Sequence, residues 1–144
     1  MVHRGEKTMR IIVDGGAGFV GSHLVERLVA QGHGVTVVDD LSNGSLENLE
    51  AVKDNVRFLK QDVSHPNVEK WGEADVVYHL ACWPRSRSFA DPRRDVEVNL
   101  IGMVNVLEYA RKVGARVIFS SNSGISGPPI KILKCPDCGY WVRR

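Results

Sequence analysis

The glycine-rich segment at residues 14–21, which reads DGGAGFVG, is the feature that most limits how this chain can fold. It joins a short apolar run at residues 9–13 to an amphipathic stretch at residues 19–31. Glycines permit a tight turn and let a helix pack closely against a strand. The segment therefore predicts a strand, a turn and a helix in direct succession.

The same alternation of strand and helix continues along the chain. A long helix is predicted to begin at Asp91, an N-cap followed by proline at the first helical position, and to end at Gly114. Short apolar strands joined by helices are typical of a parallel sheet covered on both faces. We expect an α/β fold, a Rossmann-type doubly wound parallel sheet of about five strands. Its predicted strands are residues 9–13, 35–39, 56–60, 76–80 and 116–120, and short helical crossovers are predicted at residues 46–52 and 67–71.

Composition narrows the functional classes. The chain has 144 residues and a net charge of +2, and its basic residues are spread out, so we expect no nucleic-acid partner. No apolar run is long enough to cross a membrane, and three cysteines with a polar N-terminus favour a cytoplasmic setting. The expected organisation is a leader at residues 1–8, one domain at residues 9–127, and an irregular tail with a CxxC motif at residues 128–144.

The glycine spacing and one acidic residue predict a dinucleotide site. Gly15, Gly18 and Gly21 follow a strand and open a helix, whose free N–H groups attract phosphate. Asp39 ends the second strand eighteen residues after Gly21, where a carboxylate binds the adenosine ribose. No Arg or Lys occurs between Asp39 and Glu50, so NAD is favoured over NADP. The alternative is that the glycines only tighten the turn and that Asp39 caps a loop.

The order of these motifs resembles the extended short-chain dehydrogenase/reductase family, specifically the NAD-dependent epimerase/dehydratases such as UDP-glucose 4-epimerase. The resemblance covers residues 9–127. It implies pyrophosphate binding by the N–H groups of Phe19 and Val20, ribose binding by Asp39 and Asn43, and a nicotinamide end lined by other residues. The motifs that carry it are DGGAGFVG, VVDDLSNG at residues 37–44, QDV at 61–63, YHLAC at 78–82, DP at 91–92, NLIG at 99–102 and FSS at 119–121. The remaining cofactor contacts that it implies are Asp62 and Val63 at adenine and Leu80, Ala81 and Asn99 at nicotinamide.

The sequence also departs from the family pattern. Asp14 occupies a position where the family usually has threonine, and Asn122 occupies that of the catalytic serine or threonine, with Ser123 as the neighbouring alternative. The family's catalytic Tyr-x-x-x-Lys pair has no match in this sequence, nor does a substrate-binding lobe. We therefore expect NAD binding with poor turnover by this chain alone.

Two cysteine features remain open. Cys135 and Cys138 resemble one knuckle of a zinc ribbon, but a closed zinc site needs four ligands, so the alternatives are a shared metal or two free thiols. Cys82 is expected to be a small apolar core residue.

The leading functional hypothesis is the NAD-binding domain of a nucleotide-sugar epimerase/dehydratase. The alternatives are a non-catalytic NAD-sensing or interaction module and a truncated gene product. The expected partners are NAD and a nucleotide-sugar. The helix from Asp91 also resembles one of the two that family dimers pack together, which makes a homodimer an alternative to a monomer.

Overall fold

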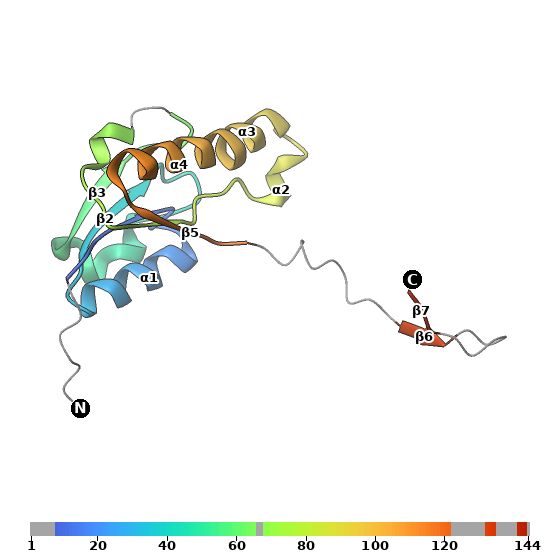
Figure 1. The fold of residues 1–144 in the computed structure, drawn as a ribbon, viewed down its shortest axis with the longest axis horizontal. Helices are drawn as coiled ribbons and strands as arrows, with labels where there is room; N and C mark the ends of the chain where they lie inside the picture. Colours follow the sequence, from blue (N-terminus) through green and yellow to red (C-terminus); the bar gives the residue numbers. More distant parts are fainter. Residues whose placement is uncertain (1–7, 66–67, 122–131, 135–140, 144) are drawn as a thin grey trace.

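The computed structural model describes residues 8–65, 68–121, 132–134 and 141–143. Five parallel strands form one sheet in the order β3-β2-β1-β4-β5 (Figure 1). The register pairs Ile12 of β1 with Thr36 of β2 and with Val77 of β4. The chain adds β2 and β3 on one side of β1 and then crosses over to add β4 and β5 on the other side, so the strand order reverses between β1 and β4. The predicted fold class is confirmed.

The strands lie close to their predicted positions. Their bounds are β1 Arg10–Asp14, β2 Gly34–Asp39, β3 Val56–Lys60, β4 Val76–His79 and β5 Arg116–Phe119. Each predicted strand differs from the observed one by at most one residue at either end. The signal was strong because β-branched residues bounded by glycine or polar residues mark buried parallel strands.

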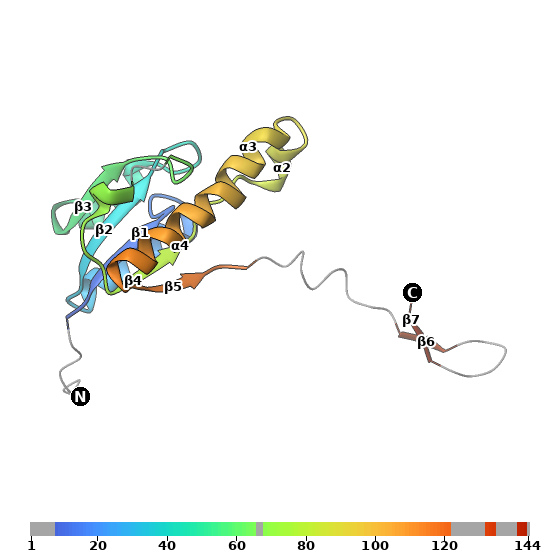
Figure 2. The ribbon, with the colours of Figure 1, turned by 45° about the horizontal axis from the view of Figure 1, so that its top comes forward.

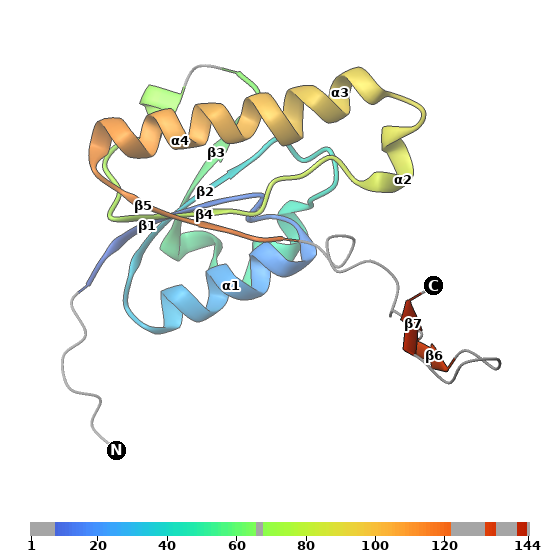
Figure 3. The ribbon, with the colours of Figure 1, turned by 45° about the vertical axis from the view of Figure 1, so that its right-hand side comes forward.

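Helices cover both faces of this sheet, as Figure 3 shows most clearly. Helix α1 (Phe19–Ala30) and the 3₁₀ segment η1 (Leu46–Asn55) lie on one face. Helix α4 (Gly102–Val113) and the 3₁₀ segment η2 (Val68–Trp71) lie on the other. Successive residues of β1 serve opposite faces, since Ile11 and Val13 pack on the α1 side and Ile12 packs on the α4 side.

The predicted long helix is present but is not uniform. It begins with α3 (Pro92–Val96), continues through a π-helical turn, η3 (Glu97–Ile101), and ends with α4 at Gly114, which has a φ of +73°. The side chain of Asp91 accepts a hydrogen bond from the Arg94 N–H at 3.0 Å, which confirms the N-cap. A π turn inside an α-helix often accompanies a functional site. Val98 of this turn lines the pocket described below. Figure 2 shows α3 and α4 running on as one continuous helix.

Three elements were not predicted. A single helical turn, α2 (Arg85–Ser88), follows β4, and nothing in its polar sequence shows a helical period. In the tail, β6 (Ile132–Lys134) pairs antiparallel with β7 (Trp141–Arg143). The expectation of a wholly irregular tail is therefore wrong for these six residues, because a short hairpin needs too few residues to leave a periodic signal. No helix among the described residues is long and apolar enough to cross a membrane.

Candidate functional site

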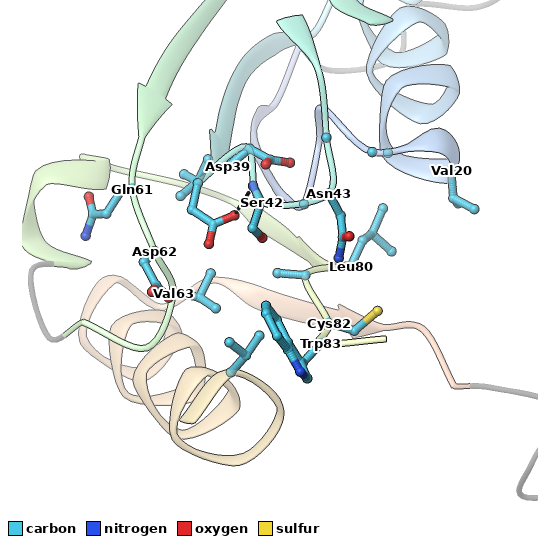
Figure 4. Close-up of a pocket in the computed structure, with 18 of the residues that line it drawn as sticks. Val20, Asp39, Ser42, Asn43, Gln61, Asp62, Val63, Leu80, Cys82 and Trp83 are labelled. Carbon is cyan, nitrogen blue, oxygen red and sulfur yellow. Dashed lines mark hydrogen bonds between the residues drawn. The ribbon is translucent and has the colours of Figure 1, made fainter. Parts of the chain in front are cut away.

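A pocket of about 350 Å³ opens at the carboxyl ends of β1, β2, β3 and β4. This is the topological switch point of the sheet, where open α/β folds bind ligands. Gln61 and Asp62 lie at one end of the pocket and Val20 lies at the other (Figure 4). The residues that line it are Gly15, Gly18, Phe19, Val20, Gly21, Val38, Asp39, Asp40, Ser42, Asn43, Gly44, Gln61, Asp62, Val63, Leu80, Ala81, Cys82, Trp83 and Val98.

The glycine turn brings backbone close to backbone. Gly15 has a φ of +68°, and a Cβ placed there would lie 2.6 Å from the Ala81 nitrogen. A Cβ on Gly21 would lie 2.2 Å from the carbonyl oxygen of Gly15. Both distances are far below van der Waals contact, so neither position accommodates a side chain without a shift of backbone.

The N-terminus of α1 faces the pocket without a side-chain cap. Its N-cap is Gly18, and its first turn contains no acidic residue. The first N–H groups of a helix have no intrahelical acceptor, and they carry partial positive charge. Phe19 and Val20 line the pocket here, and their side chains are largely exposed. This end can therefore accept an anionic group on backbone donors.

Asp39 is buried at the end of β2 and lines the pocket. Its two carboxylate oxygens accept hydrogen bonds from the Ala17 N–H at 3.0 Å and from the Leu41 N–H at 2.8 Å. Burial raises the pKa of Asp39, and these two hydrogen bonds oppose that rise. Each oxygen keeps a further lone pair, so the carboxylate can cap the loop and still accept ligand hydroxyls.

Asp14 lies beneath the pocket and does not face it. Its side chain is fully buried and accepts hydrogen bonds from the N–H groups of Leu80 and Ala81 at 3.1 and 3.0 Å. His79 Nδ1 donates to the same carboxylate at 2.8 Å, and the imidazole stacks on Phe119. A threonine-sized residue at position 14 could not reach all of these donors. The carboxylate therefore fixes the floor below Leu80 and Ala81.

Arg94 lies outside the pocket lining and contacts two residues of that lining, Asp40 and Asp62. Burial alone would raise the pKa of Asp62, but hydrogen bonds from the Ser64 N–H and hydroxyl and from Arg94 outweigh burial and lower it. Arg94 Nη2 also lies 3.4 Å from Asp40 Oδ2. The sequence has no Arg or Lys close to Asp39, but the fold brings Arg94 of α3 to this end of the pocket from more than fifty residues away.

Asn99 is placed differently from the other predicted cofactor residues. It lies on the π turn outside the pocket lining, where its amide binds both the N–H and the carbonyl of Trp83, at 2.8 and 3.2 Å. A third hydrogen bond joins it to Asp95 at 2.7 Å. Asn99 thus positions Trp83, and direct contact with nicotinamide stays a prediction.

All the other predicted cofactor residues line this one pocket. They are Gly15, Gly18, Phe19, Val20, Gly21, Asp39, Asn43, Asp62, Val63, Leu80 and Ala81. Sequence reasoning missed Trp83 and Val98 as pocket residues. Trp83 lies in the segment between β4 and α2, and Val98 lies on the π turn η3, so the fold alone brings them to the pocket. It also misplaced Cys82, which is exposed and lines the pocket, because β4 ends at His79 and the chain has left the sheet by Cys82.

The predicted catalytic and metal-binding candidates Asn122, Ser123, Cys135 and Cys138 lie outside the described residues, so their roles stay predictions. Within the described part of the chain, no cluster of three or more His, Cys, Asp or Glu side chains could hold a metal ion.

Comparison with known proteins identifies the family. The profile of the NAD dependent epimerase/dehydratase family matches residues 11–137, which is most of the chain. The chain belongs to this family. The predicted family and its NAD dependence are confirmed at this level.

Curated members of the epimerase/dehydratase family share substantial identity with this chain. UDP-glucuronic acid decarboxylase 1 of Arabidopsis thaliana is 40% identical over 130 residues, which cover 88% of this chain and 29% of that protein. The chain thus spans less than a third of this relative's length.

Solved members of the family share its fold. UDP-glucose 4-epimerase from Thermotoga maritima, solved with UDP-glucose, superposes with a TM-score of 0.77 at 36% identity, over 94% of this chain and 45% of that one. The Thermus thermophilus UDP-glucose 4-epimerase, solved with NAD, gives a TM-score of 0.72 at 40% identity, over 79% of this chain and 38% of that one.

Proposed function

We propose that this chain binds NAD in the pocket at the switch point between β1 and β4. The observation that carries the proposal is that the uncapped N-terminus of α1 and the buried carboxylate of Asp39 line one continuous pocket. A dinucleotide needs both: donors for its diphosphate and an acceptor for its adenosine ribose. The NAD complex of the Thermus thermophilus epimerase supports the same ligand class.

The proposed roles follow the order of residues along the pocket. Asp62 and Val63 contact adenine, Asp39 and Asn43 hold the ribose, and the N–H groups of Phe19 and Val20 bind the pyrophosphate. Leu80 and Ala81 then line the nicotinamide end above the Asp14 floor. The absence of side chains at Gly15 and Gly21 leaves the phosphates room to approach the backbone.

Isothermal titration calorimetry of the full chain with NAD tests this proposal. We expect saturable binding of NAD and much weaker binding of NADP, because the carboxylates of Asp39 and Asp40 repel a 2′-phosphate. The matched pair is Asp39→Asn against Asp54→Asn, since Asp54 is exposed on η1 away from the pocket. No saturable heat with NAD at millimolar concentration would refute the proposal.

For the whole protein we propose a reaction on a nucleotide-sugar. The relatives named above are a UDP-glucuronic acid decarboxylase and UDP-glucose 4-epimerases, so a UDP-sugar is the proposed substrate class. Bound NAD supplies a hydride acceptor for a sugar carbon. Asn122 and Ser123 stay the candidates for hydrogen bonding to the reacting sugar oxygen. Because the sequence contains no Tyr-x-x-x-Lys, we expect this chain alone to bind NAD and turn over UDP-glucose poorly.

We also propose self-association through the long helix. Val96, Leu100, Val104 and Leu107 recur at helical spacing and are each about half exposed. Such an unpartnered apolar stripe favours pairing with a second copy. Sedimentation velocity should show a concentration-dependent dimer that Leu100→Lys disrupts without changing NAD affinity. A monomer at all concentrations would contradict this.

We finally propose a cytoplasmic location, because the chain has three cysteines, an odd number, which suits a reducing compartment. Localisation of a tagged chain would test it.

A further inference from the structure

The adenosine end of the pocket contains more negative charge than its ligand requires. Asp39, Asp40 and Asp62 all line it, and no Lys or Arg does so among the described residues. A dinucleotide brings two further negative charges on its diphosphate. Three carboxylates without compensation would therefore oppose binding of the proposed ligand.

Arg94 supplies the compensation from the first turn of α3. Its Nη2 donates to both Asp62 and Asp40. Its Nη1 donates to the Ser64 hydroxyl at 3.1 Å and lies 3.5 Å from Glu97 Oε2. The Arg94 side chain is 20% exposed, so water screens these ion pairs less than it screens surface pairs.

The guanidinium of Arg94 also contacts the segment that follows β4. Arg94 stacks on the ring of Trp83 at 5.7 Å, and Arg87 stacks on that ring at 5.5 Å. Arg87 also donates to the carbonyl of Ser42 at 3.3 Å. Trp83 thus contacts two cations, and these also bind the loops after β2 and β3. The pocket wall at Trp83 and the acidic loops form one connected unit.

We propose that Arg94 is a positioning residue that sets cofactor affinity: as the counter-charge of Asp40 and Asp62, it lets an acidic pocket accept an anionic dinucleotide without touching that ligand. The inference rests on the proposed NAD binding. It also explains why a nearby arginine does not select NADP here, because Nη1 and Nη2 are already engaged by four side chains of this protein.

Two substitutions separate the charge of Arg94 from its packing. Arg94→Gln keeps an N–H donor and loses the charge, whereas Arg94→Lys keeps the charge and loses the planar fork. In low salt we expect Arg94→Gln to weaken NAD binding by about three- to tenfold, the size of one uncompensated charge some way from the diphosphate. Arg94→Lys should stay within about twofold of the wild type. Arg93→Gln is the matched control, because the adjacent Arg93 side chain is 90% exposed and pairs with Glu97.

A second substitution tests the mechanism. Asp40→Asn removes one of the two carboxylates that Arg94 compensates, and its Oδ1 can still accept from the Ser42 N–H. Adding Asp40→Asn to Arg94→Gln should recover most of the lost NAD affinity. High salt should recover part of it, because screening weakens the repulsion. A role in packing alone predicts no recovery by either treatment.

The outcomes distinguish the two proposals. If the wild-type chain shows no saturable NAD binding, the proposed function fails and this inference fails with it. If the wild type binds NAD but Arg94→Gln and Arg94→Lys behave alike, or Arg94→Gln matches Arg93→Gln, only the inference is overturned. Should Arg94→Gln fail to fold by circular dichroism, the comparison of Arg94→Lys with the wild type decides: a loss of about tenfold or more overturns it.

Discussion

The two ends of the pocket are built in different ways. At the α1 end, close backbone packing forms the site: Gly15 and Gly21 of one turn approach each other, and Gly15 also approaches the backbone of Ala81. At the adenosine end, charged side chains from β2, β3 and α3 meet only in the folded chain, as Asp40, Asp62 and Arg94 do. The first end therefore depends on backbone packing around a local glycine turn and the second on electrostatics between distant side chains.

This difference predicts unequal tolerance to change. A side chain added at the glycine turn clashes with backbone atoms. A charge altered at the adenosine end can instead be offset by a second charge or by salt. The expected effects therefore decrease from the α1 end, through Asp39, to positions remote from the pocket.

The floor of the α1 end should be the least tolerant. Asp14→Ala leaves His79 and the N–H groups of Leu80 and Ala81 without their buried acceptor. We expect the free energy of unfolding to fall by about 3–5 kcal/mol, as when one partner of a buried pair is removed. Urea unfolding measures this change. Asp14→Asn retains an acceptor and should cost less; an equal cost for both would show that the acceptor is unimportant.

The glycine turn comes next. Gly21→Ala places a Cβ 2.2 Å from the Gly15 carbonyl oxygen, so the turn must shift. We expect a loss of about 1–3 kcal/mol in stability from overpacking. NAD affinity should fall by at least about tenfold, because the shifted turn misplaces the phosphate donors. Gly34→Ala is the control, since its Cβ would lie 3.8 Å from the nearest atom. Unchanged NAD affinity in Gly21→Ala would break the distinction between the two ends.

Asp39 links the two ends and should make binding depend on pH. Because burial raises the pKa of Asp39, the carboxylate protonates at a higher pH than an exposed aspartate does. A protonated Asp39 loses acceptor capacity, so NAD affinity should decline as the pH falls toward the raised pKa, starting above the usual value of about 4. Calorimetry across this range should show that Asp39→Asn binds NAD about tenfold more weakly and lacks the pH dependence. The same pH profile in both proteins would show that another group titrates.

A change remote from both ends should affect stability alone. Tyr109 lies on the buried face of α4, and its hydroxyl donates to the Gly72 carbonyl at 2.6 Å. Burial raises the pKa of Tyr109 from its ordinary 10.0 to about 12, so its contribution to stability is intact below the ordinary value and is lost as the pH rises through about 12.

Tyr109→Phe should lower the free energy of unfolding by about 1 kcal/mol at neutral pH and reduce the alkaline loss. Denaturant unfolding at neutral and alkaline pH measures both effects. NAD affinity should not change, and a change would mean that the α4 core is coupled to the pocket.

The elements themselves could be predicted from sequence to within one or two residues in most cases. Periodic apolar residues mark β1 and α1, and Asp91 and Gly114 mark the ends of the long helix. The polar turn α2 carried no such signal. Site residues were predictable where they belong to a recognisable motif, as Asp39 and Asn43 belong to VVDDLSNG at residues 37–44.

The sequence by itself determined the order of strands and helices, the glycine turn and the acid that ends β2, because these depend on backbone sterics and on residues close along the chain. The tertiary structure decided that Asp14 points away from the pocket, that Cys82 lies at its surface, and that Arg94 compensates Asp40 and Asp62. Side-chain direction and charge pairing depend on which distant elements the folded sheet brings within a few ångströms. No local pattern encodes that distance.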